Sequence, residues 1–458
     1  MKQTTKAPSD GIYAAIARLS LPIVLQNLLS AAVSAADVVM LNFVGQSHIS
    51  SVALAAQYAS VLSCVFYGLG TGATILCAQY YGKGDLRAVR TVEGIALRFS
   101  IAASVLFAAG ALFFPEGMMR VFTHDPELIG IGASYLRYMS VAYLCWGIVE
   151  VHLSVLRSVG RVTTSMIINL VALLGNIVLN AVFIFGLFGA PKMGAPGVAL
   201  ATSIARGAEL LLALYVSYRS SDVKIPFRAV FERNRLLFQD FLRMALPALG
   251  NDIVWGLAFS MYSVIIGQYL GNDMVAANSF VTQVRTFGTA FCFGIANAAG
   301  ILLGQIIGEG DMERAEAAAK KSVRATVLFG AVGGIIVLIA MPFVLRFADL
   351  TPTGLGYLRG MLWINVYYIM GQAVNTTLIV GIFRAGGDSR FGFYCDIVDM
   401  WLYAVPLGFL SAAVLKLPPM VVYFLLCTDE FAKWPAVICH YRKKKWLKNI
   451  TRDNVFEG

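Results

Sequence analysis

The stretch "AQYYGKGDLRAVR" (Ala78–Arg90) returns, in altered form, as "GQIIGEGDMERAE" (Gly304–Glu316). Four residues of the first copy recur 226 positions later: Gln79, Gly82, Gly84 and Asp85 become Gln305, Gly308, Gly310 and Asp311. Glycine and aspartate at this spacing favour a tight polar turn. The same turn, half a chain length apart, predicts that the protein is built from two copies of one unit.

The composition indicates a membrane protein. Of the 458 residues, 58% are hydrophobic and only 14% are charged, against about 25% charged in a typical soluble domain. Residues 1–18 carry charge but lack the short apolar core of a cleaved signal peptide, so we expect the first apolar run to act as an uncleaved signal anchor. The seven Cys lie in or beside apolar runs and give no redox or metal signal.

Twelve apolar runs are each long enough to cross a bilayer, which takes a helix of about 20 residues. They are continuous and lack the alternating pattern of barrel strands, so helices are expected. The predicted spans are 16–43, 50–78, 91–114, 131–156, 162–187, 195–218, 242–269, 273–306, 316–346, 355–383, 390–412 and 419–441.

Positive charge predicts the orientation. With the N-terminus inside, 27 of the 36 Lys and Arg fall in or beside inside segments, and 6 fall in or beside outside segments. Because cytoplasmic loops carry the excess of Lys and Arg, both termini are expected to be cytoplasmic, in the plasma (inner) membrane of a prokaryote. The basic stretch "HYRKKKWLK" (His440–Lys448) is expected to face anionic lipid rather than nucleic acid.

Further echoes extend the repeat. "LP" at 21–22 returns at 246–247, and "LRSVG" (Leu156–Gly160) returns as "FRAGG" (Phe383–Gly387). The spans therefore divide into two pseudo-symmetric lobes of six helices, an arrangement typical of secondary transporters. The predicted organisation is an N-lobe (1–218), a cytoplasmic linker (219–241), a C-lobe (242–441) and a basic cytoplasmic tail (442–458).

Several stretches resemble the multidrug and toxic compound extrusion (MATE) family, in its bacterial DNA-damage-inducible F-like branch. They are "AADVVMLNFVG" (Ala35–Gly45), "LRSVGRVTTSMIINLVALLGNIVLNAVFIFG" (Leu156–Gly186), "MGAPGVALATSIAR" (Met193–Arg206) and "FRAGGDSRFGFYCDIVDMW" (Phe383–Trp401). The resemblance covers essentially the whole chain. It implies an all-α, V-shaped fold and the export of amphipathic, often cationic small molecules by ion antiport with alternating access. We expect no cofactor, and we expect the protein to be a monomer.

One carboxylate lies in the outer half of the predicted N-lobe helices. Asp37, Asn180 and Thr202 sit about 9–11 Å from the outer ends of their helices, at 1.5 Å per residue, and Asn176 shares a face with Asn180. Ionisable groups in hydrocarbon are functional candidates, so these four residues form the expected ion-coupling site. A lone carboxylate suits a proton, and oxygen ligands suit sodium.

Two points stay open for this cluster. Relatives in the resembled branch often carry a second Asp where this chain has Asn180, so the coupling ion is either a proton or sodium. The only metal site expected is a sodium site at Asp37. The alternative interpretation is an interhelical hydrogen-bond network, which explains the amides better than it explains Asp37.

The predicted C-lobe offers candidates for a substrate cavity: Asp252, Trp255, Asp396 and Asp399. In the alternative interpretation, Asp252 is capped by neighbouring helices, and Asp396 and Asp399 pair with an arginine at 384 or 390. The i, i+3 pair of Arg206 and Glu209 is expected to be structural. The predicted last span carries Asp429, Glu430 and Lys433, which are expected to form an internal salt bridge.

Rival functions fit less well. A lipid-linked flippase of the same superfamily often has fourteen spans and a basic cavity, whereas only Arg98, Arg206 and Arg285 lie deep in these helices. A membrane-embedded enzyme would need a motif such as HExxH or GxSxG, and neither occurs. A channel is disfavoured by the duplicated lobes. The absence of a phosphate-binding P-loop argues against direct drive by ATP.

Overall fold

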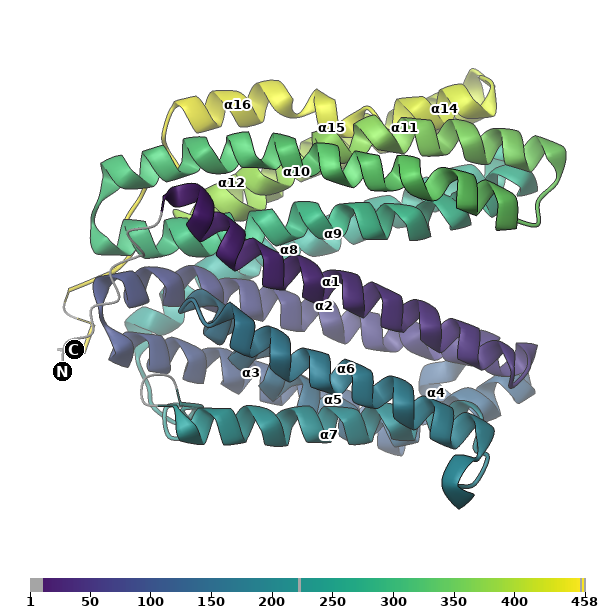
Figure 1. The fold of residues 1–458 in the computed structure, drawn as a ribbon, viewed down its shortest axis with the longest axis horizontal. Coiled ribbons are helices and arrows are strands. Elements are labelled where there is room, and N and C mark those ends of the chain that lie inside the picture. Colours follow the sequence, from purple (N-terminus) through teal and green to yellow (C-terminus); the bar gives the residue numbers. More distant parts are fainter. Residues whose placement is uncertain (1–10, 221–223, 454, 457–458) are drawn as a thin grey trace. The chain divides into compact units, whose positions relative to one another are not determined.

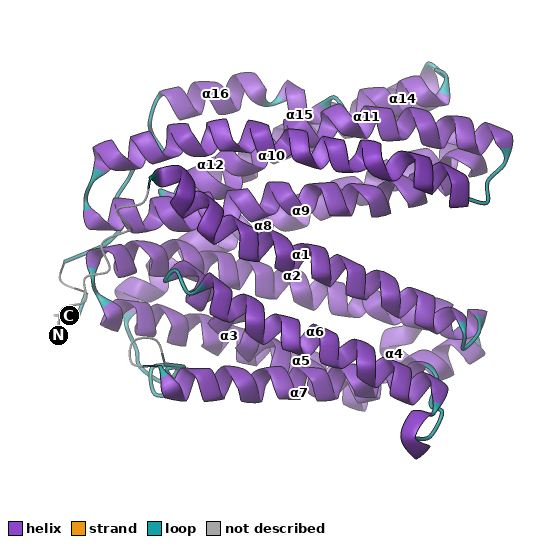
Figure 2. Cartoon of the chain, in the orientation of Figure 1, coloured by secondary structure: helices purple, strands orange, loops and turns teal. Residues whose placement is uncertain are grey.

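All twelve predicted spans are helical in the computed structural model, which describes residues 11–220, 224–453 and 455–456. Within these residues the chain forms helices and loops and no strand (Figure 2). Lys2 and Lys6, which the predicted topology places in the cytoplasm, lie outside the described residues. So do residues 221–223 of the predicted linker and residues 454 and 457–458 of the predicted tail.

The helices follow the predicted runs with small shifts at their ends (Figure 1). The first half of the chain forms α1 (Ile12–Asn42), α2 (Gln46–Lys83), α3 (Leu86–Phe113), α4 (Pro115–Arg120), α5 (Pro126–Ser158), α6 (Val162–Phe185) and α7 (Ala195–Arg219). The second half forms α8 (Arg235–Ile265), α9 (Asn272–Glu309), α10 (Met312–Phe347), α11 (Pro352–Thr376), α12 (Ser389–Asp396), α13 (Val405–Phe409), α14 (Pro419–Leu426), α15 (Asp429–Ala432) and α16 (Trp434–Arg442).

Short π-helical segments extend several of the second-half helices: Ile266–Leu270, Thr377–Phe383, Ile397–Ala404 and Leu410–Val414. Joined by these turns, eleven helical segments of the described chain are long and apolar enough to cross a bilayer. The protein is therefore a multi-pass membrane protein.

The last predicted span, 419–441, is divided into α14, α15 and α16 rather than forming one continuous helix. Two features explain the breaks. Buried charged side chains at Asp429, Glu430 and Lys433 interrupt the apolar run, and Pro435 has no backbone N–H to give to the preceding turn.

The doubled polar turn has the same conformation in both copies. Gly84 and Gly310 adopt left-handed backbone angles, with φ of 84° and 87°, which glycine tolerates because it has no Cβ. The aspartate that follows each glycine caps the next helix. Asp85 accepts a hydrogen bond from the backbone N–H of Ala88, and Asp311 accepts one from that of Arg314, both at 2.9 Å.

The glycine two residues earlier has a different role. A Cβ placed on Gly82 would lie 2.0 Å from the backbone oxygen of Gln305, which belongs to the second copy of the motif. The last turn of α2 therefore passes directly against the backbone of α9. Only glycine permits so close an approach.

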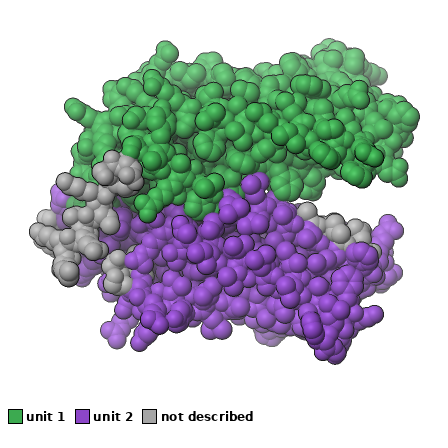
Figure 3. Space-filling view, in the orientation of Figure 1, with its two compact units in different colours: residues 1–24, 82–84, 246–451 green, residues 25–81, 85–245, 452–458 purple. Residues whose placement is uncertain are grey.

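The chain divides into two compact units, which Figure 3 shows in different colours. Unit 1 comprises residues 1–24, 82–84 and 246–451, and unit 2 comprises residues 25–81, 85–245 and 452–458. Unit 1 thus holds most of the second half of the chain, and unit 2 holds most of the first half. The start of α1 groups with unit 1, where a Cβ on Gly294 would lie 2.2 Å from a methyl carbon of Val24.

The predicted linker is held within unit 2 by one arginine. Arg98 of α3 donates hydrogen bonds to the backbone carbonyls of Val230 and Glu232, at 2.6 and 2.5 Å. The tail is held in the same unit, because Arg452 makes two hydrogen bonds to the Asp240 carboxylate, at 2.7 and 2.8 Å. Arg98, a charged residue within a predicted span, thus donates hydrogen bonds to backbone carbonyls in a part of the linker that forms no regular helix.

Candidate functional site

Within unit 2, the four residues of the predicted ion-coupling cluster form one hydrogen-bonded chain. The Asn180 amide of α6 donates to the Asp37 carboxylate of α1 at 2.7 Å and to the Asn176 oxygen at 3.3 Å. Asn176 in turn donates to the Thr202 hydroxyl of α7 at 3.1 Å. The structure therefore brings together all four side chains.

Asp37 lies in this chain without a basic partner. None of the ion pairs among the described residues involves Asp37. Among the described residues, its hydrogen-bond partner is the neutral amide of Asn180, whose own oxygen is fully buried and accepts no hydrogen bond. The cluster thus contains a half-buried carboxylate and an unused oxygen acceptor, and both could receive a proton or a small cation.

Four buried or partly buried acids of unit 1, by contrast, lie beside basic side chains: Asp252, Asp396, Asp399 and Glu430. Asp252 of α8 lies 3.2 Å from an Arg384 nitrogen. The same nitrogen donates to the Asn251 oxygen at 2.7 Å, and Asn251 donates to Asp396 of α12 at 2.6 Å. Sequence reasoning considered Arg384 as a partner for Asp396 or Asp399. The structure pairs Arg384 directly with Asp252 and reaches Asp396 only through Asn251.

Lys433 is the centre of the unit 1 network. Its ammonium nitrogen lies 3.3 Å from Asp396, 3.6 Å from Asp399 and 3.2 Å from Glu430. All four side chains are buried, and the Asn375 amide donates to Glu430 at 2.7 Å. Three carboxyl groups therefore surround one ammonium group.

The MatE family model matches residues 22–182 and, a second time, residues 248–410. The chain belongs to the MatE family. The double match confirms the predicted duplication, because the two matched segments begin 226 positions apart. Members of this family are transporters, so the chain is a membrane transporter of the multidrug efflux (MATE) type and not an enzyme.

Individual relatives are distant but match along nearly the whole chain. The chain is 22% identical over 449 residues to an uncharacterized transporter of Bacillus subtilis, YisQ, covering 97% of each protein. It is 22% identical to a probable multidrug resistance protein, NorM, of Thermotoga maritima, covering 96% of this chain and 95% of the relative.

Solved structures share the fold. A multidrug resistance MATE transporter in an outward-facing conformation matches with a TM-score of 0.86 at 19% identity, over 94% of this chain and 95% of that chain. A MOP superfamily transporter from Pyrococcus furiosus matches with a TM-score of 0.85 at 19% identity, over 94% and 96%. The predicted twelve-helix MATE fold is thereby confirmed.

Of the other predicted cavity residues in this MATE chain, Trp255 lies in an aromatic cluster. Its ring meets Phe259 at 4.7 Å and Phe293 at 6.1 Å, edge to face in both cases. Trp255 is partly buried and packs against the hydrophobic core of unit 1.

The structural pair predicted on α7 is present in unit 2. Arg206 donates to Glu209 at 2.6 Å, and the buried Asn169 of α6 donates to the other Glu209 oxygen at 3.1 Å. Glu209 is fully enclosed. This arrangement satisfies both carboxylate oxygens inside the membrane.

Unit 1 of the MATE fold repeats this arrangement with opposite charges. Glu430 and Lys433, again three residues apart, pair at 3.2 Å. Asp396 contacts Lys433 and stands at the repeat position of Asn169, 227 residues later. In unit 2 the basic residue comes first and the acid binds the neighbouring helix. In unit 1 the acid, Glu430, comes first, and Lys433 contacts Asp396 of the neighbouring helix.

A buried pair that sequence reasoning missed lies between α3 and α5. His152 Nδ1 lies 2.6 Å from the Glu93 carboxylate, and both side chains are fully buried. Glu93 and His152 lie 59 positions apart, and the sequence gives no signal of their contact. Among the described residues, no group of three or more His, Cys, Asp or Glu could hold a metal ion.

Proposed function

We propose that this MATE chain is a secondary antiporter of a prokaryotic plasma membrane, with both termini cytoplasmic. It exports amphipathic, cationic small molecules by alternating access, as a monomer without a cofactor, in exchange for protons or sodium. The observation that carries the proposal is Asp37, a carboxylate within a spanning helix that is hydrogen-bonded to Asn180 at 2.7 Å and has no basic partner among the residues that the structure describes. The relatives named as multidrug resistance proteins support the substrate class.

The orientation of the Asn180 side-chain amide depends on whether Asp37 is ionised, protonated or bound to a cation. With the carboxylate bare, Asn180 presents its NH₂ group, as in the structure, and leaves its own oxygen unused. With the carboxyl protonated, or with sodium bound, rotating the amide would turn that oxygen toward Asp37 as an acceptor or ligand. Ion binding would then rearrange the contacts that join α1 to α6.

Antiport follows if ion and substrate compete for this charge. A cationic substrate is drawn to the bare carboxylate, and binding of a proton or sodium removes that attraction. A ligand shifts a conformational equilibrium only by its differential affinity for the two states. The contacts that change between the bare and the occupied Asp37 supply such a difference.

The test is export into inside-out vesicles, with proton and sodium gradients imposed separately. We expect Asp37→Asn to insert and fold, because the amide keeps the size and hydrogen bonding of the carboxyl, but to lose gradient-driven export. Asn180→Ala should keep part of the activity. Asn180→Asp should shift the pH or sodium dependence, because it adds a second carboxylate to the cluster. Asp349→Asn, in an exposed loop, is the control at matched expression.

Export by Asp37→Asn near the wild-type rate would move the coupling site elsewhere. The Lys433 network, with its three carboxylates, is then the next candidate. Asp252, Trp255, Asp396 and Asp399 stay proposed cavity residues. Asp252→Asn should raise the accumulation of an ethidium-like dye in a drug-sensitive bacterium, and unchanged accumulation would remove Asp252 from the cavity.

A further inference from the structure

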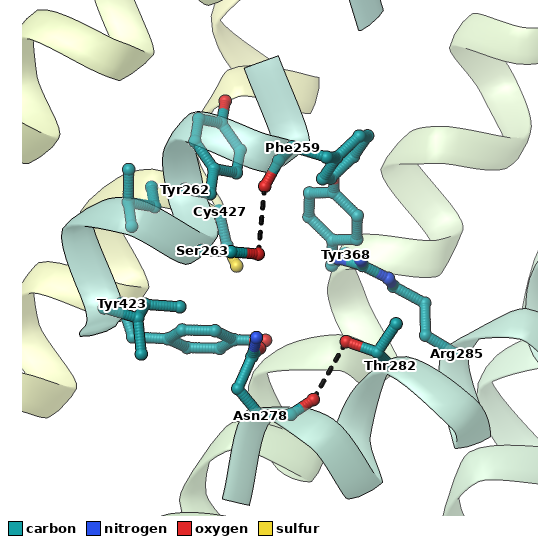
Figure 4. Close-up of a pocket in the computed structure, with 11 residues that line it drawn as sticks. Phe259, Tyr262, Ser263, Asn278, Thr282, Arg285, Tyr368, Tyr423 and Cys427 are labelled. Carbon is teal, nitrogen blue, oxygen red and sulfur yellow. Dashed lines mark hydrogen bonds between the residues drawn. The ribbon is translucent and has the colours of Figure 1, made fainter. Parts of the chain in front are cut away.

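A small, partly open cavity lies in unit 1, lined by residues of α8, α9 and α11 and of the segment around α14 (Figure 4). Its volume is about 110 Å³, whereas sites for whole drug-sized ligands measure about 300–1,000 Å³. The cavity can therefore hold one functional group of such a molecule. Arg285, which lines it, lies about 20 Å along α9 from Asn272, within the membrane-spanning part of the helix.

Arg285 has aromatic neighbours, and no acidic residue lines the cavity beside it. Its guanidinium carbon lies 4.9 Å from the centre of the Phe259 ring and 5.8 Å from that of Tyr368. No hydrogen bond or ion pair joins Arg285 to another residue that the structure describes. The Asp429 carboxylate, farther away, instead accepts hydrogen bonds from the Tyr262 hydroxyl at 3.1 Å and from the backbone N–H of Glu430 at 2.8 Å.

An unpaired charge at this depth is costly. Aromatic faces attract a guanidinium, but they accept few of its five N–H donors. Polar groups around the cavity are also unused. The buried Tyr368 hydroxyl has no hydrogen-bond partner. Asn278 lies on the same face of α9 as Arg285, two turns earlier, and its side-chain amide forms part of the cavity wall.

This donor set fits one chemistry. A guanidinium binds a carboxylate through parallel N–H bonds, and a tyrosine hydroxyl and an amide NH₂ can donate further bonds to the same oxygens. The aromatic walls suit the apolar part that carries the group. The cavity thus has the opposite polarity to the Asp37 cluster, which suits cations.

We propose that this cavity is a binding subsite for a compact anionic group, held by Arg285. The anionic group is either the carboxylate of a zwitterionic amphipathic substrate or a free inorganic anion. The inference rests on the proposed export function and assigns to unit 1 a pocket for the anionic group of a substrate.

Two dyes test the subsite directly. Rhodamine 110 carries a free carboxylate, and rhodamine 123 is its methyl ester, so the pair differs only in this group. Binding of each dye to the full chain in lipid nanodiscs is measured by fluorescence polarisation in chloride-free buffer. We expect Arg285→Gln to weaken rhodamine 110 binding about tenfold or more, while rhodamine 123 binding changes less than about twofold.

Three further variants make the test specific. Arg285→Lys keeps the positive charge and should keep part of the rhodamine 110 affinity. Asn278→Asp places a carboxylate inside the cavity and should also weaken rhodamine 110 binding, so it serves if Arg285→Gln does not fold. Arg206→Gln is the matched control. Arg206 also lies beside an aromatic ring, 5.1 Å from that of Trp146, but it is already paired with Glu209.

Adding chloride separates the two sources of the anion. If chloride competes with rhodamine 110 in the wild type, and Arg285→Gln abolishes the competition but not dye binding, the group is a free anion. The proposal is overturned if Arg285→Gln changes the affinities for both dyes equally, or changes neither affinity nor chloride competition. Gradient-driven export of rhodamine 123 tests the proposed function separately, because the ester lacks the group that the cavity would take.

Discussion

Replacing Gly82 by alanine tests the close contact between Gly82 of the first motif copy and the backbone of Gln305 in the second. The new Cβ would lie 2.0 Å from the Gln305 carbonyl oxygen, where an ordinary contact begins at 3.4 Å, so α2 and α9 must separate by about 1.4 Å. Overpacking of this kind costs roughly 1–3 kcal/mol. We place Gly82→Ala near 3 kcal/mol, because the opposing atom belongs to a helical backbone and cannot rotate away.

A second effect has the opposite sign. Gly82 lies inside α2, and alanine is favoured over glycine in a helix by about 1 kcal/mol. The expected net destabilisation is therefore about 2 kcal/mol. In the control Gly207→Ala, on α7, the new Cβ would meet no atom within 4 Å. This variant should be neutral or stabilised by up to about 1 kcal/mol.

The assay is the fraction of monodisperse protein that survives heating in detergent, followed by size-exclusion chromatography. At roughly 1 °C of Tm per kcal/mol for a chain of 458 residues, Gly82→Ala should melt about 2 °C below wild type, and Gly207→Ala should not. A Gly82→Ala protein as stable as the Gly207→Ala protein would refute the close approach of α2 and α9.

Three further predictions follow from the described contacts. Asp85→Ala and Asp311→Ala should each cost about 1 kcal/mol, because each removes one helix cap, and equal losses of Tm would confirm that the two caps are equivalent. Lys433→Met should leave three buried carboxylates without their shared cation and cost about 3–5 kcal/mol; the yield of folded protein should recover in Lys433→Arg. Cysteines introduced at Gly84 and Gly310 should react with an impermeant reagent from the same, cytoplasmic side, and labelling from opposite sides would contradict the duplicated topology.

The sequence was sufficient for the main features of the fold. Hydropathy located all twelve helical segments, because a helix in lipid must satisfy its own backbone and be apolar over its length. The doubled motif predicted the duplication, since Gly84 and Gly310 need the same left-handed backbone and Asp85 and Asp311 the same caps. The breaks around α15 were harder to foresee, because their charged residues are stabilised by partners from other helices.

Some contacts of the candidate site could be predicted from the sequence and others could not, for a similar reason. Asp37 and Asn180 were grouped correctly because depth along a helix can be counted from its ends. Contacts that depend on helix rotation and packing were not accessible in this way. Examples are the pairing of Asp252 with Arg384 and the contact of Glu93 with His152. Arg285 was noted only as a basic residue deep in a helix, because a sequence cannot show that a charge lacks a partner.

The inverted charge pairs of α7 and α15 have a consequence for how such a transporter can arise. In a symmetric dimer of six-helix subunits, both halves come from one gene, so every charge appears twice with the same sign. Fusing the two halves into one chain removes that constraint. Each half can then mutate separately, and one geometry can hold a carboxylate in the first half and a lysine in the second. Asymmetry of this kind lets a single polypeptide offer a lone acid in one half and a lone guanidinium in the other.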